Sequence, residues 1–448
     1  MDLEGIFKAY DVRGKVPSEL DEEAATRIGV GFAEFADVPA IAVGWDCRSS
    51  SPALRDALVD GVTRTGTNVD LLGGVTTDVI YYVSGEKSMP GVMITASHNP
   101  KGYNGMKFCL AAAVPVAGDS GLASIKATAI QTDLAAEPVR RGEVRTIDPL
   151  PGYIEHLLSV VDSDAMAELR VAADGGNGMA GVVVEDLFDR IPPQLIGLYL
   201  EPDGEFPNHH PDPLRPENLV DLSALVDSSG ADLGVAFDGD ADRAFFIDDK
   251  LIPLPGSTTT AMVAAWFLAR EPGASIVYNL ICSKAVPEAV TRLGGNPIRT
   301  RVGHSYIKQI MADSGAVFGG EHSGHYYFRE NYRADSGLLT MLVLLQLLSE
   351  DGRKLSEMRK DFEPYSPSGE INLTVEDKEA AMAAVAESFA DASIDLLDGL
   401  TVEWSDRWFN LRSSNTESVL RLNAEAGSAE DVDALVASVR SVIDGSGD

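Results

Sequence analysis

The sequence predicts an α/β fold divided into several domains, and two observations support this prediction. Helical stretches alternate with short apolar strands that lack polar alternation, a pattern typical of buried parallel or mixed sheets. With 448 residues, the chain is long enough for roughly three domains. The predicted strands each run into a polar or Gly-rich loop, and they include Ile41–Trp45, Gly91–Ile94, Val171–Ala173, Leu233–Phe237, Ala316–Phe318 and Trp408–Leu411.

Polar stretches that contain Pro or Gly divide the chain into three α/β blocks of similar size and a smaller C-terminal block. These stretches lie near Asp148–Gly152, Asp248–Pro255 and Phe362–Gly369. We therefore expect domains at residues 1–147, 148–250, 251–364 and 365–448. The three larger blocks are candidates for diverged repeats, although their sequence similarity is too weak to establish it.

Two helices are expected from the apolar pattern. Leu338–Leu348 is too short to span a bilayer and predicts a buried helix. Residues 428–443 predict an amphipathic helix at the C-terminus, with Ser428 and Asp431 as a capping box.

Charge and cysteine content exclude several function classes. The chain carries 36 basic and 69 acidic side chains, a net charge of −33, so we expect neither a nucleic-acid partner nor a basic membrane-binding patch. Its 3 cysteines are far apart in the sequence, which indicates reduced thiols. The N-terminus lacks the features of a secretory signal, so a cytoplasmic location is expected.

The segment Thr95–Pro100 places the Ser97 hydroxyl at the end of a predicted strand. Lys101 and Lys107 follow closely, which suits a serine that carries or receives a phosphoryl group. An ordinary hydrogen-bonded turn is the alternative. A Ser97–His98 dyad is disfavoured, because we expect adjacent side chains to be poorly placed for the required hydrogen bond.

The segment Asp238–Arg243 carries carboxylates at alternate positions after a predicted strand. Asp238, Asp240 and Asp242 can converge on one hard cation such as Mg²⁺. Without a cation they would repel one another, by about 4 kcal/mol per pair at 4 Å and an effective dielectric of 20. An EF-hand is excluded, because Arg243 and Asp249 stand where that loop needs Gly and Glu. Arg243 either neutralises the acids or contacts a substrate.

Further loops offer hydrogen-bonding groups, although each also fits an ordinary surface turn. Gly319–His325 presents Glu, Ser and His side chains that suit sugar hydroxyls. Arg412–Glu417 combines a guanidinium with hydroxyls and backbone N–H groups that suit a phosphate. Arg13 near the N-terminus and His304 after Gly303 are weaker candidates.

The glycines of Gly176–Gly181 match a dinucleotide-binding pattern, since a strand precedes them and Glu201 follows about 20 residues later. Two observations disfavour that interpretation. The pattern lies in mid-chain, and Asp174 at the strand end would repel a pyrophosphate.

Taken together, the motifs resemble the α-D-phosphohexomutase family, and the resemblance covers nearly the whole chain. Within the family the sequence is most similar to the bacterial phosphomannomutase and phosphomannomutase/phosphoglucomutase type. The loop at 412–417 lacks the Pro and Gly usual in phosphoglucosamine mutases. The matching segments are KAYDVRG (8–14), TASHNP (95–100), GYNGMK (102–107), DGDADR (238–243), GEHSGH (320–325) and RSSNTE (412–417).

The resemblance implies a heart-shaped molecule, with three α/β domains and a smaller C-terminal α+β domain around a central cleft. It implies a phosphoserine at Ser97, and Mg²⁺ held by Ser97, Asp238, Asp240 and Asp242. The expected reaction is the reversible interconversion of hexose 6-phosphate and hexose 1-phosphate, with mannose as the expected sugar and glucose as an additional candidate. A bound hexose 1,6-bisphosphate is the implied intermediate and activator.

The resemblance also implies roles for the remaining residues. Arg13, Lys107 and Arg243 would line the reacting end, with Lys107, His304 and His325 as alternatives for the general acid/base. Substrate contacts would come from the following residues: Tyr10, Arg243, Gly303, Glu321, Ser323, Arg412, Ser414, Asn415 and Thr416.

Alternative functions remain open at this point. Within the family these are a phosphoglucomutase or an aminosugar mutase. Outside it, they are a Mg²⁺-dependent sugar phosphatase or a non-catalytic sugar-phosphate-binding protein. We expect small hexose phosphates as partners, and a monomer or weak dimer.

Overall fold

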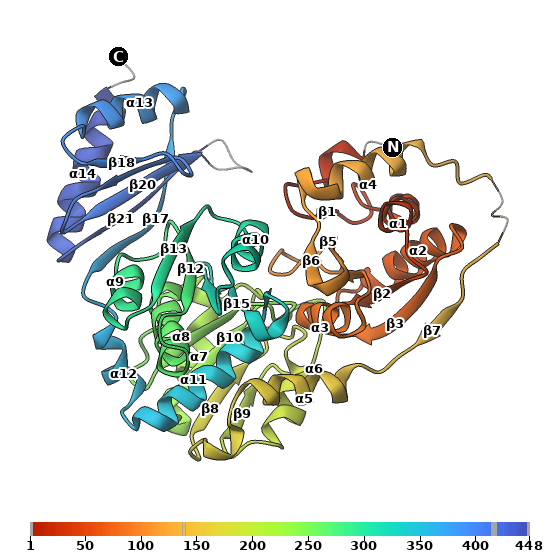
Figure 1. The fold of residues 1–448 in the computed structure, drawn as a ribbon, viewed down its shortest axis with the longest axis horizontal. Helices are drawn as coiled ribbons and strands as arrows, with labels where there is room; N and C mark the ends of the chain where they lie inside the picture. Colours follow the sequence, from red (N-terminus) through yellow and green to blue (C-terminus); the bar gives the residue numbers. More distant parts are fainter. Residues whose placement is uncertain (1–2, 137, 139, 414–418, 446–448) are drawn as a thin grey trace.

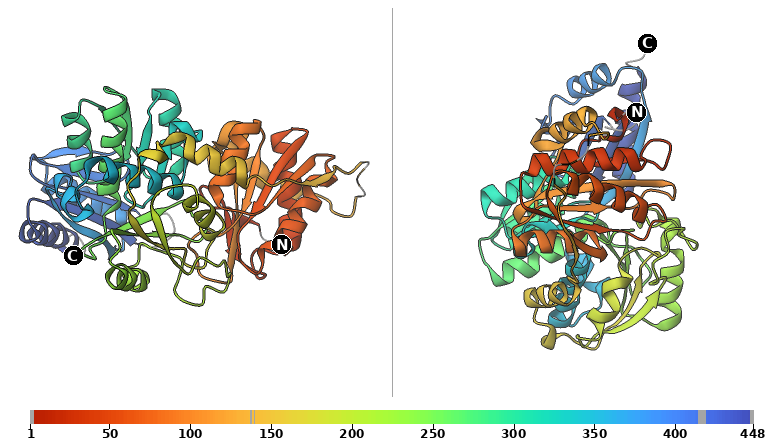
Figure 2. Two further views of the ribbon diagram at one scale, coloured as in Figure 1. Left: turned by 90° about the horizontal axis from the view of Figure 1, so that it is seen from below. Right: turned by 90° about the vertical axis from the view of Figure 1, so that its right-hand side faces the viewer.

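The computed structural model describes residues 3–136, 138, 140–413 and 419–445. The chain forms four domains in an arc, with domain 1 and domain 4 at its two ends (Figure 1). Domains 2 and 3 lie between them, as the view from below also shows (Figure 2). Among the described residues, no helix combines the length and the apolar character that crossing a membrane requires.

Domain 1 is built on a 7-stranded mixed sheet in the order β1-β5-β4-β2-β3-β7, with β6 paired to β5. Its elements are β1 (Val12–Lys15), α1 (Glu22–Ala36), β2 (Ala40–Trp45), α2 (Ser51–Arg64), β3 (Asn68–Gly74), α3 (Thr77–Lys87), β4 (Gly91–Ile94), β5 (Tyr103–Leu110), β6 (Val114–Pro115), α4 (Ala123–Gln131) and β7 (Val144–Thr146).

Domain 2 has a 4-stranded sheet in the order β11-β10-β8-β9. Its elements are α5 (Leu150–Val160), β8 (Arg170–Asp174), α6 (Gly181–Phe188), β9 (Gln194–Leu198), α7 (Val220–Ser229), β10 (Leu233–Phe237) and β11 (Ala244–Asp248).

Domain 3 has a 5-stranded sheet in the order β13-β12-β14-β15-β16. Its elements are α8 (Gly256–Arg270), β12 (Ser275–Asn279), α9 (Ala285–Arg292), β13 (Asn296–Thr300), α10 (His304–Ser314), β14 (Phe318–Gly320), β15 (Tyr326–Phe328), β16 (Ala334–Asp335), α11 (Gly337–Asp351) and α12 (Leu355–Met358).

Domain 4 differs from the others, because its 5-stranded sheet, in the order β17-β21-β20-β19-β18, is antiparallel throughout. Two helices share an apolar core with this sheet. Its elements are β17 (Ser366–Thr374), α13 (Lys378–Ser388), β18 (Ser393–Asp395), β19 (Leu400–Glu403), β20 (Trp408–Ser413), β21 (Val419–Ala426) and α14 (Ala429–Gly445).

The first three domains share one strand arrangement, which supports the repeat hypothesis. In each domain, one strand pairs in parallel with a neighbour on either side, and one of these neighbours also pairs antiparallel with the strand that follows it in the chain. The strand orders are β3-β2-β4-β5, β9-β8-β10-β11 and β13-β12-β14-β15. The loop between the last two strands of each set (β4 to β5, β10 to β11 and β14 to β15) holds the Ser97, aspartate and Glu321 motifs, respectively. The repeat therefore places three functional loops at equivalent positions.

The predicted strand at Ala316–Phe318 is shifted in the structure, where β14 spans Phe318–Gly320. Gly319 pairs with Val277, and Gly320 pairs with Tyr326, so both glycines belong to the sheet. A Cβ atom on Gly320 would lie 2.4 Å from Thr260 Oγ1. Glycine is therefore needed for close packing of the sheet on α8 rather than for a loop.

Both helices expected from the apolar pattern are present. α11 is buried along most of its length, and α14 has a buried apolar stripe. At the start of α14, the Asp431 backbone N–H donates to Ser428 Oγ at 3.2 Å. The reciprocal contact differs from a capping box, because Asp431 Oδ2 accepts from the Ser428 hydroxyl at 2.6 Å instead of from a backbone N–H.

A buried carboxylate joins three domains. Asp78 of domain 1 accepts hydrogen bonds from Tyr153 of domain 2 and from Ser336 of domain 3, the latter at 2.6 Å. Burial raises the pKa of Asp78 to about 6. This junction fixes domain 3 against domain 1 and thereby sets the relative positions of their loops.

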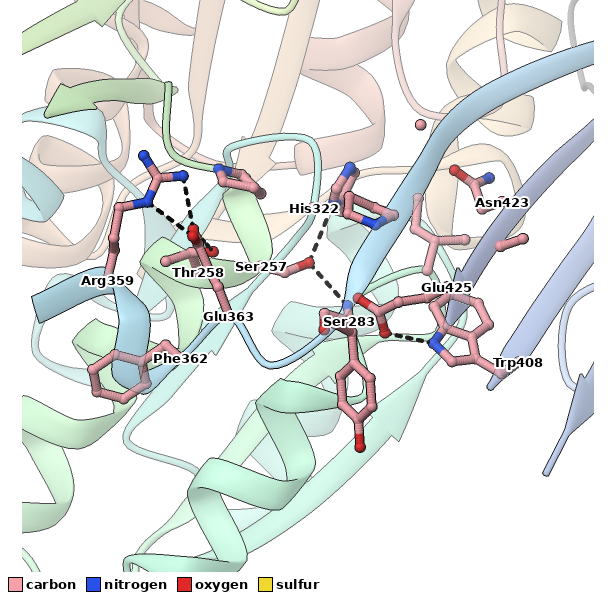
Figure 3. Close-up of a pocket in the computed structure, with 16 residues that line it drawn as sticks. Ser257, Thr258, Ser283, His322, Arg359, Phe362, Glu363, Trp408, Asn423 and Glu425 are labelled. Carbon is pink, nitrogen blue, oxygen red and sulfur yellow. Dashed lines mark hydrogen bonds and ion pairs between the residues drawn. The ribbon is translucent and has the colours of Figure 1, made fainter. Parts of the chain in front are cut away.

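A cavity of about 240 Å³ lies where domain 3 meets domain 4 (Figure 3). His322 lines it from domain 3, and its Nδ1 lies 3.0 Å from Ser257 Oγ. Trp408 and Glu425 line it from domain 4 and are joined by a 2.8 Å hydrogen bond. His322 therefore faces the domain junction and not the carboxylate cluster described below.

Candidate active site

Ser97 is brought against the aspartate loop across a separation of 141 residues. Its Oγ donates to Asp238 Oδ2 at 2.7 Å, and its backbone N–H donates to Thr95 Oγ1 at 2.9 Å. Ser97 is buried and has a φ of 49°, in the left-handed region that few non-glycine residues adopt. The hydroxyl is thus held at one place beside a carboxylate.

The three aspartates form one buried cluster, with carboxylate oxygens within 4.8 Å of one another. Lys107 Nζ donates to Asp240 Oδ2 at 2.7 Å and to Asp242 Oδ2 at 2.5 Å. Arg243 Nε donates to Asp238 Oδ2 at 2.9 Å. Lys107 and Arg243 therefore offset part of the repulsion that the sequence predicts among the three aspartates.

The pKa values of this cluster diverge. Burial raises the pKa of Asp238 to about 8, while Arg243 opposes that shift. Burial also acts to raise the pKa of Asp240, but Lys107 outweighs it and the net shift is downward. The pKa of Lys107 lies above its usual value, because Asp240 and Asp242 outweigh the effect of its burial. Asp240 and Lys107 therefore form a charged pair.

The donor set fits a divalent cation. Asp240 Oδ1 and Asp242 Oδ1 are buried and have no hydrogen-bond partner within the described parts of the chain. Buried carboxylate oxygens without partners are costly, and Mg²⁺ takes such oxygens as ligands. Asp242 also forms a second candidate group with His325 and Asp335. Asp335 is paired with Lys308 at 3.0 Å, just as the three aspartates are paired with Lys107 and Arg243.

His98 lies beside Ser97. Its Nδ1 is 3.2 Å from Ser97 Oγ, but the Ser97 hydroxyl donates its one hydrogen to Asp238, so this contact is not the serine-to-histidine hydrogen bond that a dyad requires. The left-handed backbone at Ser97 turns the two side chains toward one another. Burial and the nearby Arg243 lower the pKa of His98 well below its usual value. His98 is therefore a neutral neighbour of the hydroxyl.

The Glu321 loop is ordered by its own hydrogen bonds. Glu321 is buried, and its carboxylate accepts from Ser323 Oγ and from Tyr327 Oη, each at 2.9 Å. Ser323 Oγ also lies 3.2 Å from His325 Nδ1. His325 forms a β-bridge with Arg243 and lies 3.7 Å from Asp242 through its Nε2. The structure thus joins this loop to the aspartate loop.

Tyr10, Gly303 and His304 come together, although they are far apart in the sequence. The Tyr10 and His304 rings meet edge to face with centroids 5.2 Å apart. Gly303 has a φ of 136°, and a Cβ there would lie 2.7 Å from Tyr10 Oη. Burial and Lys308 lower the pKa of His304 to about 3. His304 is therefore neutral at physiological pH.

Arg13 lies beside the Ser97 loop. Its Nη1 donates to Asn99 Oδ1 and its Nη2 donates to Asp11 Oδ2, each at 2.5 Å. Arg13 Nε is buried without a hydrogen-bond partner in the described part of the chain. The side chain is thus held in place and keeps one donor for another group.

The segment Arg412–Glu417, which the sequence predicts to bind a phosphate, is described only in part. Arg412 lies at the end of β20, and its Nη2 lies 3.4 Å from Glu370 Oε2. Ser414, Asn415 and Thr416 lie outside the described residues. Arg421 on β21 pairs in register with Arg412 and contacts Glu370 at 3.4 Å. The sequence interpretation missed this second guanidinium, although its strand position opposite Arg412 could have indicated it.

The glycine pattern of Gly176–Gly181 supports the aspartate loop. A Cβ on Gly178 would lie 2.7 Å from the carbonyl oxygen of Gly239. The backbone N–H of Met179 donates to that same oxygen at 3.0 Å. Protein atoms thus occupy the space that a pyrophosphate would need, which agrees with rejecting a dinucleotide site.

Comparison with protein families gives a match in every domain. Phosphoglucomutase/phosphomannomutase alpha/beta/alpha domains I, II and III match residues 4–135, 151–251 and 255–365, and the C-terminal domain matches residues 370–442. The chain belongs to the phosphoglucomutase/phosphomannomutase family. The predicted family and the four-domain fold class are confirmed.

Individual proteins agree with this assignment. The chain is 41% identical over 424 residues to a protein named phosphohexose mutases from Xanthomonas campestris pv. campestris, covering 94% of each chain. It is 38% identical over 431 residues to a phosphomannomutase from Escherichia coli, again covering 94% of each. A crystal structure of a family protein from Burkholderia thailandensis superposes with a TM-score of 0.91 at 31% identity, covering 100% of this chain and 98% of that one. The predicted enzyme class, a phosphohexomutase, is confirmed by these relatives.

Proposed function

We propose that this family member interconverts hexose 6-phosphate and hexose 1-phosphate through a phosphorylated Ser97, with mannose as the preferred sugar and glucose as a second substrate. One observation carries the mechanism: the Ser97 hydroxyl lies 2.7 Å from Asp238, in a cluster where Asp240 and Asp242 each keep a buried oxygen without a partner among the described residues. The name of the Escherichia coli relative, phosphomannomutase, supports the choice of mannose, and that of the Xanthomonas campestris relative, phosphohexose mutases, supports a hexose phosphate.

Phosphorylation of Ser97 would add about −1.5 to −2 charges beside three carboxylates. Lys107 and Arg243 offset part of that charge, and the unpartnered oxygens are suited to Mg²⁺, which we propose is held by Ser97, Asp238, Asp240 and Asp242. When bound, a divalent cation there would offset charge on the phosphoryl oxygens.

The proposed reaction consists of two phosphoryl transfers. A hydroxyl oxygen of the hexose phosphate forms a bond to the phosphorus on Ser97 while the bond from Ser97 Oγ breaks, which yields a hexose 1,6-bisphosphate. The bisphosphate then turns around within the site. Ser97 Oγ attacks its other phosphorus, so the serine is phosphorylated again and the isomeric monophosphate leaves.

We propose His325 as the group that accepts and returns the proton of the reacting hydroxyl. Its ring is 24% exposed and lies between the Glu321 and aspartate loops. Lys107 is held as an ammonium by two carboxylates, and the lowered pKa of His304 makes it a weak base. Arg13 and Arg243 would then steady the phosphoryl group at the reacting end.

Recognition of the rest of the substrate would use the other loops. We propose that Glu321 and Ser323 bind sugar hydroxyls, and that Tyr10 and Gly303 line the same end of the site. The phosphate that does not react would be held by Arg412, Ser414, Asn415 and Thr416. Such remote binding orients the reacting end.

A paired assay tests the proposal. We would measure kcat/KM for mannose 1-phosphate and glucose 1-phosphate with Mg²⁺ and a trace of glucose 1,6-bisphosphate, and we expect turnover of both with a preference for mannose. Ser97→Ala should lose about 10³-fold or more in kcat, because the phosphoryl carrier is absent. Ser88→Ala is the matched control, since exposed Ser88 shares the φ of 49°.

Each other outcome rejects a stated part of the proposal. Turnover of glucosamine 1-phosphate alone would replace the sugar assignment with an aminosugar mutase. Free phosphate released in step with substrate loss would indicate a phosphatase. Saturable binding without turnover by the Ser97-phosphorylated protein would indicate a binding protein. Near-wild-type turnover by Ser97→Ala would refute the phosphoserine mechanism.

A further inference from the structure

The guanidinium of Arg48 binds the backbone of the Ser97 loop at four points. Its Nη2 donates to the carbonyl oxygens of Ser97 and Asn99 at 2.7 and 2.6 Å. Its Nη1 donates to those of Pro100 and Tyr103 at 2.9 and 3.1 Å. These carbonyls span the turn that follows β4, so one side chain holds the whole turn.

Arg48 is itself fixed by a hydrogen bond to Asp46 and covered by an aromatic ring. Its Nε donates to Asp46 Oδ2 at 3.1 Å, and Ser51 Oγ donates to Asp46 Oδ1 at 2.5 Å. The ring of Phe206, from domain 2, lies over the guanidinium with its centroid 5.1 Å away. Arg48 is 3% exposed, and all five of its guanidinium N–H groups are used. Arg48 therefore has one fixed position.

The turn needs such support because its backbone is unfavourable. The φ of 49° at Ser97 lies in the left-handed region, which is stable only where surrounding contacts enforce it. That conformation places Oγ beside Asp238 and turns the Ser97 carbonyl toward Arg48. The hydrogen bond to the carbonyl thus constrains the same residue whose hydroxyl lies against the aspartates.

We propose that Arg48 is a positioning residue for phosphoryl transfer, which holds the Ser97 turn in the conformation that aims Oγ at the aspartate cluster. This inference rests on the proposed function of Ser97. Arg48 touches no reacting atom and acts only through the loop backbone. In-line transfer depends on sub-ångström placement of the reacting oxygen, so loosening the turn slows the chemical step.

A lysine cannot replace this arginine. The guanidinium is a rigid planar fork with five donors, whereas an ammonium presents three donors from one point. The lysine side chain would keep the positive charge beside Asp46 but would leave some of the four carbonyls without a donor. Arg48→Lys therefore tests the hydrogen-bonding geometry of the guanidinium while the positive charge beside Asp46 is kept. Arg55→Lys is the matched control, because Arg55 lies in the same domain and its guanidinium lies over the Trp45 ring and pairs with the exposed Asp56, without a hydrogen bond to the described residues of the Ser97 turn.

The first measurement is steady-state kinetics of Ser97-phosphorylated protein with mannose 1-phosphate and glucose 1-phosphate. We expect Arg48→Lys to lower kcat by about 10- to 100-fold, with KM within about two-fold of the wild-type value. KM is preserved because Glu321, Ser323 and Arg412, the proposed contacts to the sugar hydroxyls and to the phosphate that does not react, lie in domains 3 and 4. Arg55→Lys should match the wild type. Arg48→Lys with kcat within about two-fold of wild type would overturn the proposal.

The second measurement does not depend on activity. Amide hydrogen exchange of residues 97–103 should become about ten-fold faster in Arg48→Lys, while exchange in β12 of domain 3 is unchanged. Faster exchange across the whole of domain 1 would show a general structural role and would refute the proposal. If the wild-type protein itself has no mutase activity, the proposed function fails, and this measurement still tests the contact of Arg48 with the loop.

A third measurement uses Arg48→Ala with added guanidinium ion at millimolar concentration. Partial recovery of kcat by guanidinium, and none by ammonium at the same ionic strength, is the expected result. Equal recovery by both ions would contradict a geometric role. Should Arg48→Ala fail to fold, the kinetics and exchange of Arg48→Lys decide the question.

Discussion

Replacing Gly178 by alanine should weaken metal binding without touching a proposed ligand. The added Cβ would lie 2.7 Å from the carbonyl oxygen of Gly239 and 2.9 Å from its Cα. Non-bonded carbon atoms favour about 3.5–4.0 Å, so the backbone at Gly239 must move by about 0.5 Å or more. Gly239 connects Asp238 to Asp240, and its movement displaces both carboxylates.

The expected magnitude follows from the cost of overpacking, which is about 1–3 kcal/mol. If the carboxylates of Asp238 and Asp240 move to relieve this overpacking, the cost of about 1–3 kcal/mol is lost from the free energy of Mg²⁺ binding. The affinity for Mg²⁺ should then fall about 5- to 150-fold. Calorimetric titration with Mg²⁺ measures the affinity, and the Mg²⁺-induced rise in Tm gives a second readout. Gly427→Ala is the control, because nothing lies within 4 Å of its Cβ position. Gly178→Ala that binds Mg²⁺ within about two-fold of wild type would refute this account of the glycine motif.

Three further predictions follow from the same geometry. Asp240→Asn should lose the Mg²⁺-induced rise in Tm together with at least about 100-fold in kcat/KM, since a buried ligand becomes neutral; an unchanged Mg²⁺ titration would contradict the ligand assignment. Arg412→Ala should raise KM more than it lowers kcat, because the lost contact lies far from the transfer; steady-state kinetics showing only a kcat loss would contradict this. The pKa of Asp78 is about 6 in the folded protein, against an ordinary value of 3.8. Its contribution to the free energy of unfolding is therefore greatest below about pH 4, and it declines by up to about 3 kcal/mol as the pH rises from about 4 to about 6. Asp78→Asn should remove that decline in urea unfolding midpoints measured against pH, and parallel profiles for variant and wild type would show the reasoning to be wrong.

Much of the candidate site could be predicted from local sequence. A polar loop directly after an apolar run lies at a strand end, and this rule located the loops of Ser97 and Asp238 within the fold. Arg412, expected just after the strand, instead lies within β20, which continues to Ser413. Alternating carboxylates repel one another at short range, which made a cation site predictable from spacing alone. The rule was less accurate at Gly319 and Gly320, because glycines there serve close packing of the sheet on α8.

Other features required the tertiary structure. Arg48 carries no local signal of its role, because its four carbonyl partners lie 49 to 55 residues away. The left-handed φ of Ser97 and its contact with His98 are also not encoded by the residue type, because serine rarely adopts that region. Arg421 joins Arg412 only through the pairing of β20 with β21.

The sequence by itself determined the chemistry of the loops, the α/β class and the family, because residue type, apolar runs and short motifs are local properties. Only the tertiary structure decided that these loops meet. Three domains repeat one strand order, and the packing of the domains brings the loops after β4, β10 and β14 together, for example through His325 beside Asp242. The contact of Ser97 with Asp238 joins residues 141 positions apart. Such contacts arise from how whole domains pack, for example around buried Asp78, and no local pattern encodes that packing.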